Sequence, residues 1–263
     1  MRARYMTARR VAVLEAALSD RDRQVLATLS RVRVATALQL QHLHFADVSA
    51  RQARHVLASL TGRGLLARLR RVVGGVRAGS AGYVYTLGPA GVRLAAESGR
   101  RPQKPWELGA LFLAHSLAVT QLYAQLVSAS RAGRFALLDF AAEPACWRSF
   151  HGPGGGRVVL KPDAALRLGL GAYEDRWFVE VDRGTESLST VARKCELYRQ
   201  YWQSGIEQAR SGVFPRVLWL VPDAHRSDAL VDVIGRLPAE AWPLFAVAPM
   251  GEATERLARG AGV

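Results

Sequence analysis

The order of helical and strand-like patterns near the start of the chain constrains its fold more than any other sequence feature. Apolar residues recur at helical spacing from residue 20 onwards, in residues 34–43 and in residues 49–60. This spacing predicts three short helices, because such residues share one helix face. Residues 65–73 and 83–87 have strand-like patterns separated by the glycine-rich residues 74–82, which predicts a β-hairpin. Before them, residues 1–18 are expected to form a basic arm or a further short helix.

The positive charge of the chain is concentrated in its first part. The whole chain carries 36 Lys and Arg against 22 Asp and Glu, a formal net charge of +14. Residues 1–105 contain 19 of the basic and 5 of the acidic residues, whereas residues 106–263 contain 17 of each. A basic segment attached to a neutral one is the electrostatic footprint of a protein that binds a polyanion. We therefore expect the first part to bind nucleic acid.

The third predicted helix offers polar side chains for this binding on the face opposite its apolar residues. Over residues 18–98 the order of elements resembles the winged helix-turn-helix family, in which the third helix enters the major groove. The resemblance implies that this polar face reads base edges, where Arg suits guanine and Gln suits adenine, and that hairpin arginines contact phosphates or the minor groove. A solvated basic face, or a hairpin used for protein contacts, is the alternative. The candidate DNA-binding residues are Arg51, Gln52, Arg54 and His55 on the helix, and Arg68, Arg70, Arg71 and Arg77 on the hairpin.

A polar segment with two prolines, residues 99–105, predicts a linker between a first domain, residues 1–98, and a second domain, residues 106–263. In the second domain the patterns alternate between helices and strands, which predicts an α/β sandwich, so the fold class is α/β overall. The expected helices are residues 106–130, 188–202 and 226–236, and the expected strands are residues 135–140, 158–168, 176–181, 217–221 and 244–247.

Acidic side chains gather at the ends of two predicted strands. Asp163 follows a proline in one strand, and Glu180 and Asp182 close the next. Because strand side chains alternate, Glu180 and Asp182 share a face, and pairing of the two strands as a hairpin would bring Asp163 alongside Glu180. Three such carboxylates can hold Mg²⁺ or Mn²⁺, which activates water for phosphodiester hydrolysis. Glu143 is a candidate fourth acid, and a solvated strand rim is the alternative.

Residues 107–222 resemble the PD-(D/E)XK nuclease superfamily in their order of helix, three strands, helix and strand. The resemblance assigns Asp163 and Glu180 to the superfamily's two acids, but Asp182 stands where the superfamily has a lysine that stabilises the transition state. Lys194, with Tyr198 one turn later on the same helix, and Lys161, which shares strand parity with Asp163, are candidate replacements. The resemblance implies either a metal-dependent DNA endonuclease or an inactive fold kept for binding.

The whole arrangement resembles one more specific family, the replication-relaxation proteins of actinobacterial plasmids and mobile elements. The similarity spans residues 20–225, includes His115 in the long helix, and is most specific in residues 180–186. The resemblance implies that the family also has an acid at the position of Asp182. This favours a functional site with a Glu-x-Asp pattern over a nuclease site that has lost its lysine. The resemblance implies a DNA-binding protein acting in replication, relaxation or mobilisation, with DNA cleavage at Asp163 and Glu180 as one expectation. A non-catalytic transcription or replication regulator is the alternative.

The remaining sequence features concern compartment and partners. No apolar run is expected to span a bilayer, and Glu15 interrupts the apolar part of an N-terminus that makes a poor signal peptide. Cys146 and Cys195 are too few for a disulfide framework or a zinc site. We therefore expect a cytoplasmic protein that binds double-stranded DNA and no membrane. A homodimer would fit the reading of paired half-sites, and other replication or mobilisation proteins are candidate partners.

Overall fold

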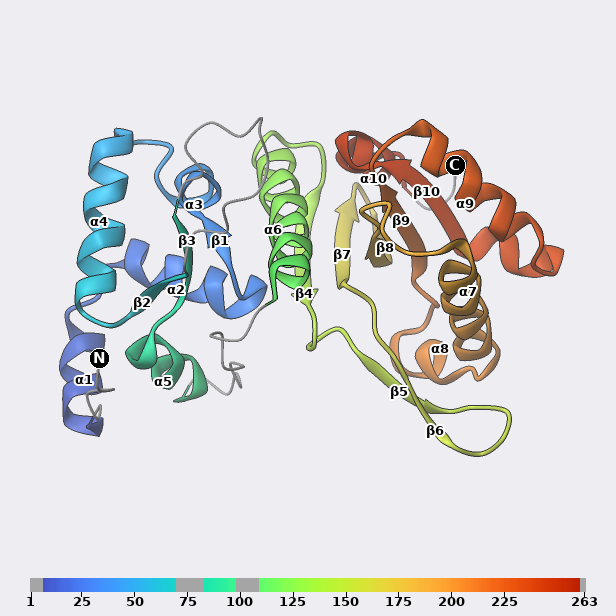
Figure 1. The fold of residues 1–263 in the computed structure, drawn as a ribbon, viewed down its shortest axis with the longest axis horizontal. Coiled ribbons are helices and arrows are strands. Elements are labelled where there is room, and N and C mark those ends of the chain that lie inside the picture. Colours follow the sequence, from blue (N-terminus) through green and yellow to red (C-terminus); the bar gives the residue numbers. More distant parts are fainter. Residues whose placement is uncertain (1–6, 70–82, 98–108, 261–263) are drawn as a thin grey trace. The chain divides into compact units, whose positions relative to one another are not determined.

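The computed structural model of the chain describes residues 7–69, 83–97 and 109–260. The fold is mixed α/β and divides into two compact units, Met1–Ala124 and Gln125–Val263 (Figure 1). The division falls inside the long helix α6, Ala110–Arg131, and not at the predicted linker, residues 99–105, which lies outside the described residues. The first part of α6 belongs to the first unit because Thr120 donates to the Val34 carbonyl at 2.7 Å and Gln39 donates to the Leu117 carbonyl at 3.1 Å.

Side-chain caps set the starts of three helices in the first unit. Ser19, Thr36 and Ser49 each accept a hydrogen bond from the backbone three residues on, and that later side chain accepts one in return. Ser19 therefore caps α2, and α3 begins at Ala37, later than the predicted start at residue 34. The elements of this unit are α1 Ala8–Ala16, α2 Asp20–Val32, β1 Ala35–Thr36, α3 Ala37–His44, α4 Ala50–Gly62, β2 Leu66–Leu69, β3 Val84–Leu87 and α5 Pro89–Glu97.

A small sheet closes the core of the first unit. β2 and β3 pair antiparallel, as predicted, with Leu66 opposite Leu87, and β1 adds to the other edge of β3, with Ala35 opposite Tyr85. The tip between β2 and β3 lies outside the described residues. The buried side chains that hold the helices on this sheet include Val25, Leu29, Leu40, Phe45, Leu57, Leu60, Leu65 and Tyr85.

The second unit is built on a five-stranded sheet in the order β10-β9-β8-β7-β4. Strands β8, β9 and β10 run parallel to one another, whereas β4 and β7 are antiparallel to their neighbours. Its elements are β4 Ala136–Ala142, β5 Arg148–His151, β6 Arg157–Leu160, β7 Ala164–Leu170, β8 Tyr173–Val181, α7 Leu188–Gln203, α8 Ile206–Ser211, β9 Arg216–Val221, α9 Ala224–Gly235, β10 Phe245–Pro249 and α10 Ala253–Ala258, with short 3₁₀ helices at Ala239–Leu244 and Met250–Glu252.

The predicted single strand over residues 158–168 is wrong, because two strands occupy it. β6 ends at Leu160 and β7 begins at Ala164, and β6 pairs with β5 in a separate two-stranded sheet. The break contains Pro162, which has no N–H to donate to a strand ladder. The consequence is that Asp163 lies immediately before β7, where the chain re-enters the main sheet.

Helices α7 and α9 pack together beside the main sheet, with α7 close to the strand that carries Glu180 (Figure 1). Phe178 of β8 pairs with Val217 of β9, and both belong to the buried cluster under these helices. Glu180 is two residues after Phe178 and therefore faces the same helices. The sheet thus directs a carboxylate into an apolar layer, where it requires partners.

Helix α6 differs from the sequence prediction in one respect. Within the described residues it is long and apolar enough to cross a membrane by length and composition, whereas no such run was predicted. Of its most apolar window, 44% is buried inside the protein, and its Thr120 donates to the Val34 carbonyl. This partial burial and this hydrogen bond are consistent with a helix of a soluble protein.

Candidate functional site

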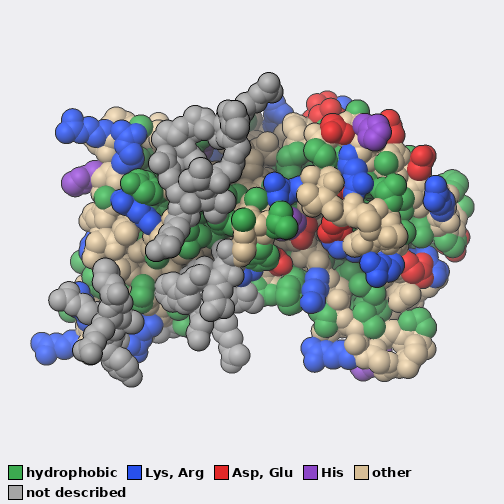
Figure 2. Space-filling model, viewed as in Figure 1, with side chains coloured by type: hydrophobic (Ala, Val, Ile, Leu, Met, Phe, Trp, Pro, Cys, Tyr) green, Lys and Arg blue, Asp and Glu red, His purple; other side chains and the backbone are tan. Residues whose placement is uncertain are grey.

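Helix α4 presents the predicted base-reading side chains on its outer face. Arg51, Gln52, Arg54 and His55 are all exposed, whereas the apolar residues of the helix face the core. The Gln52 side-chain oxygen also accepts from the backbone N–H of Ser49 at 3.0 Å, which holds this side chain at the start of the helix. Helix α4 forms one edge of the first unit, and Figure 2 shows basic side chains and a histidine protruding from this edge.

Arg21 of α2 adjoins this face and was not singled out from the sequence. It lines a hollow together with Val48, Arg51, Gln52 and His55. Its Nη2 donates to Asp47 Oδ2 at 2.5 Å, and this hydrogen bond is the main cause that lowers the pKa of Asp47. The available signal was a basic residue in the first turn of the first of the three predicted helices.

The predicted hairpin contacts are described only in part. Arg68 of β2 is exposed, and its guanidinium carbon lies 4.4 Å from the ring centroid of Tyr83 and 5.8 Å from that of Tyr85. These rings hold Arg68 on the strand that leads to the hairpin tip. Arg70, Arg71 and Arg77 lie outside the described residues.

Asp163 and Glu180 come together at the end of the β7–β8 pair where β7 begins and β8 ends. The antiparallel pairing that brings Asp163 alongside Glu180 is present, with Ala164 opposite Val179. Asp163 N–H donates to the Val179 carbonyl at 3.0 Å, and Asp163 Oδ2 accepts from Val181 N–H at 2.7 Å. Glu143 reaches the same place through its backbone, donating to the Asp163 carbonyl at 3.1 Å. We refer to Asp163 and Glu180 as the acid pair.

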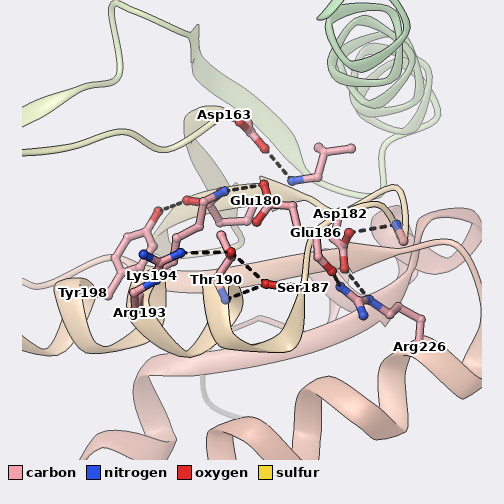
Figure 3. A network of polar contacts seen from close by, with 12 residues as sticks. Asp163, Glu180, Asp182, Glu186, Ser187, Thr190, Arg193, Lys194, Tyr198 and Arg226 are labelled. Carbon is pink, nitrogen blue, oxygen red and sulfur yellow. Dashed lines mark hydrogen bonds and ion pairs between the residues drawn. The ribbon is translucent and has the colours of Figure 1, made fainter. Parts of the chain in front are cut away.

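Two side chains of α7 bind Glu180, which is only 1% exposed (Figure 3). Lys194 Nζ lies 3.1 Å from Glu180 Oε2, and Tyr198 Oη donates to Glu180 Oε1 at 2.7 Å. The Lys194 ammonium also lies 3.0 Å from Glu186 Oε1. Lys194 and Tyr198 are four residues apart, so one face of α7 supplies both donors.

Burial and mutual repulsion set the protonation of the acid pair. Burial first, and then the charge of Asp163, raise the pKa of Glu180 to about 8. Burial works against the charge of Lys194, yet the carboxylates of Glu180 and Asp163 raise the pKa of its ammonium. Two carboxylates this close favour a shared proton or a further cation.

Asp182 does not join the acid pair. Its Oδ2 lies 2.6 Å from Arg226 Nε of α9, and its Oδ1 accepts from Gly184 N–H at 2.8 Å. Arg226 Nη2 also donates to the Glu186 carbonyl at 2.6 Å. Figure 3 shows Asp182 directed at Arg226. Asp182 therefore braces the segment 182–187, which leads into α7.

The predicted set of three metal-binding carboxylates is therefore not assembled around Asp163, Glu180 and Asp182. Across residues 7–69, 83–97 and 109–260, no three His, Cys, Asp or Glu side chains are grouped so as to hold a metal ion. The acid pair alone still suits Mg²⁺, which is commonly held by one or two carboxylates together with substrate phosphates and water. Of the two candidate lysines, Lys194 reaches Glu180, whereas the exposed Lys161 lies 4.8 Å from the ring centroid of Trp147.

The other candidate groups lie apart from this chemistry. His115 is half-buried in the part of α6 that belongs to the first unit. Cys146 and Cys195 are buried, and burial raises the pKa of both thiols, that of Cys195 to about 12. Neither thiol therefore supplies a thiolate nucleophile at neutral pH.

These features define a mixed α/β protein with an exposed basic helix in one unit and a buried acid pair in the other. The model of the replication-relaxation family matches residues 26–217, well over half of the chain, so the chain belongs to this family, as the sequence predicted. The matched residues include both α4 and the acid pair. No curated protein and no solved structure matches the chain. Membership suggests a role in the replication or relaxation of a plasmid or mobile element.

Proposed function

We propose that the chain binds double-stranded DNA of a plasmid or other mobile element through a winged helix-turn-helix formed by α2, α3, α4 and the β2–β3 hairpin. The observation that carries the proposal is the outer face of α4, where Arg51, Gln52, Arg54 and His55 are all exposed. The helix contains no acidic residue, and it belongs to the part of the chain that holds the excess of positive charge.

The chemistry of this face suits the major groove. An α-helix fits that groove, and arginine pairs with guanine through two hydrogen bonds. Arg51 and Gln52 lie in the first turn of α4, the part of a recognition helix that contacts base edges. Arg21 lines a hollow with residues of this face, and Arg68 is exposed on β2; both side chains suit phosphates.

The test is the affinity of the full chain for fluorescein-labelled plasmid-derived duplexes, measured by anisotropy over a range of salt. Arg51→Ala combined with Arg54→Ala should weaken binding at least tenfold and flatten the dependence of affinity on salt. Arg134→Ala combined with Arg236→Ala removes the same charge from exposed positions of the second unit and serves as control. Equal affinities of the two double variants would contradict the proposal.

We propose, as a second candidate function, metal-dependent cleavage of the bound DNA at the acid pair. The favouring observation is that Asp163, just before β7, lies alongside the end of β8 that carries Glu180, with Lys194 at 3.1 Å from Glu180. When bound, Mg²⁺ or Mn²⁺ supplies the charge that activates water for phosphodiester hydrolysis. Asp163 and Glu180 would hold the ion, and Lys194 would stabilise negative charge on the phosphate. A non-catalytic regulator remains the rival function.

Supercoiled plasmid with Mg²⁺ or Mn²⁺ separates the two functions. Nicking or linearisation by the unmodified chain that is lost in both Asp163→Asn and Glu180→Gln would support cleavage. Glu174→Gln, at a partly exposed carboxylate in the same sheet, is the matched control and should cleave normally. No cleavage by a chain that still shifts the DNA would favour the regulator.

A further inference from the structure

The β5–β6 hairpin leaves the main sheet immediately before the acid pair. β5 and β6 pair only with each other, and β6 ends at Leu160, three residues before Asp163 (Figure 1). Residues 144–162 contain no Asp or Glu, although the second part of the chain has equal numbers of acidic and basic residues. We call residues 148–161 the hairpin arm.

The base of the hairpin arm is fixed to the core of the second unit. Phe150 and Leu160 are buried in the cluster under α7, and the Phe150 ring lies 5.1 Å from the Tyr201 ring, centroid to centroid. Arg148 Nε lies 3.1 Å from Glu207 Oε2 of α8, which is itself buried. The arm is therefore held by apolar packing and an ion pair on one face.

The opposite face of the hairpin arm is polar and basic. His151 stands directly opposite Arg157, and both are exposed, as is Ser149, whose hydroxyl accepts from Arg157 Nη2 at 3.2 Å. Lys161 continues this exposed face towards Asp163, with its ammonium over the Trp147 ring. Figure 2 shows blue and purple side chains on the lobe that the hairpin forms.

The tip of the hairpin arm is almost without side chains. It consists of glycines and one proline, residues 152–156. At Gly154 an added Cβ would meet no atom within 4 Å. Because glycines have no side chains, the backbone of this tip can come close to the surface of a polymer such as DNA. The basic residues on either side of the tip carry the charge that binds phosphates.

We infer that the hairpin arm contacts the phosphate backbone of double-stranded DNA and directs it to the acid pair. The inference rests on the proposed DNA binding but uses a surface separate from α4. The occupant is a polyanion because His151, Arg157 and Lys161 face solvent with no acidic residue of the arm to neutralise them. Each phosphate neutralised by such a residue adds about 0.9 to the slope of log affinity against log salt.

The first test measures the affinity of the full chain for a labelled duplex at several salt concentrations. Arg157→Ala combined with Lys161→Ala should weaken binding several-fold and lower the salt slope by about 2. Arg167→Ala combined with Arg259→Ala removes the same charge from other positions of the second unit, where each arginine already pairs with a carboxylate. This control should keep the affinity and slope of the unmodified chain.

The second test locates the arm on the DNA. Gly154→Cys is labelled with an iron chelate that cuts nearby DNA through hydroxyl radicals, and Tyr173→Cys, at the opposite end of β8 from Glu180, is the control. The two native cysteines are buried and should not take the label. Cuts by the Gly154→Cys conjugate alone would support the arm. No cuts, together with unchanged affinity in the arm variant, would overturn the inference about the hairpin arm while leaving DNA binding by α4 intact. An unmodified chain that binds no duplex would overturn both the arm inference and the proposed DNA binding.

Discussion

Arg226 of α9 binds Asp182 just beyond the end of β8, with 2.6 Å between Arg226 Nε and Asp182 Oδ2. The same guanidinium donates to the Glu186 carbonyl at 2.6 Å, so one arginine joins both ends of the segment that leads into α7. α7 carries Lys194 and Tyr198, the two partners of Glu180. Asp182 thus supports the helix from which the Lys194 ammonium reaches the acid pair.

Loss of Arg226 should destabilise the second unit strongly. The Asp182 side chain is fully buried, so Arg226→Ala would leave its carboxylate without its ionic partner. Breaking a buried pair on one side costs about 3 kcal/mol or more, and urea denaturation would measure this loss. Arg259→Ala breaks an exposed pair with Glu255 and should cost about 1 kcal/mol or less. Equal costs for the two variants would refute the bracing role.

The pKa of Glu180 predicts how stability changes with pH. Its folded value of about 8 lies above the ordinary 4.5, so between these values the folded chain holds a proton that the unfolded chain has lost. Stability should therefore fall as pH rises from about 5 to about 8. Glu180→Gln removes this dependence. The melting temperature of the variant minus that of the unmodified chain should therefore rise steadily from about pH 5 to about pH 8.

The matched control for this titration is Glu174→Gln, which changes a partly exposed carboxylate on the same strand. Its melting temperature should follow that of the unmodified chain at every pH. A constant difference between Glu180→Gln and the unmodified chain from pH 5 to pH 9 would show that Glu180 titrates as an ordinary carboxylate.

Local chemistry made much of this site predictable. Alternation along β8 places Glu180 on the face that α7 covers, and the spacing of Lys194 and Tyr198 places both on one face of that helix. The third helix was likewise evident from sequence, because the apolar residues of 49–60 have helical spacing, and α4 occupies Ala50–Gly62. Features that depend on neighbouring residues along one element were therefore accessible.

The rest depended on contacts between distant segments. Arg226 lies 44 residues after Asp182, and no local pattern links them. The strand break at Pro162 had a local signal, but the pairing of β6 with β5 depends on burial of Phe150 and Leu160 under α7. The first part of α6 joins the first unit through Thr120, whose hydrogen bond to Val34 spans 86 residues.

Asp47 should restrain DNA binding by occupying Arg21. The Arg21–Asp47 contact is exposed and adjoins the outer face of α4, so a phosphate would compete with Asp47 for the guanidinium. Asp47→Asn should therefore raise affinity for a labelled duplex a few-fold at low salt. The gain should disappear in a chain that also carries Arg21→Ala, and a gain that persists there would place the effect of Asp47 elsewhere.

Tyr198 should stabilise the ionised form of Glu180. Its hydroxyl donates to Glu180 Oε1 at 2.7 Å, and this hydrogen bond acts to lower the pKa that burial and Asp163 raise. Tyr198→Phe leaves a buried carboxylate oxygen without that donor, a loss of about 1–3 kcal/mol. The destabilisation should be larger at pH 9 than at pH 6, because only the ionised carboxylate needs both donors.

Urea denaturation of the unmodified chain and of Tyr198→Phe at the two pH values would measure this difference. Tyr201→Phe is the matched control, since its hydroxyl donates to Glu207 in a separate buried network that contains no acid pair. Its cost should change less between pH 6 and pH 9. A Tyr198→Phe cost that is the same at both values would mean that the hydroxyl contributes packing and hydrogen bonding without tuning the charge of Glu180.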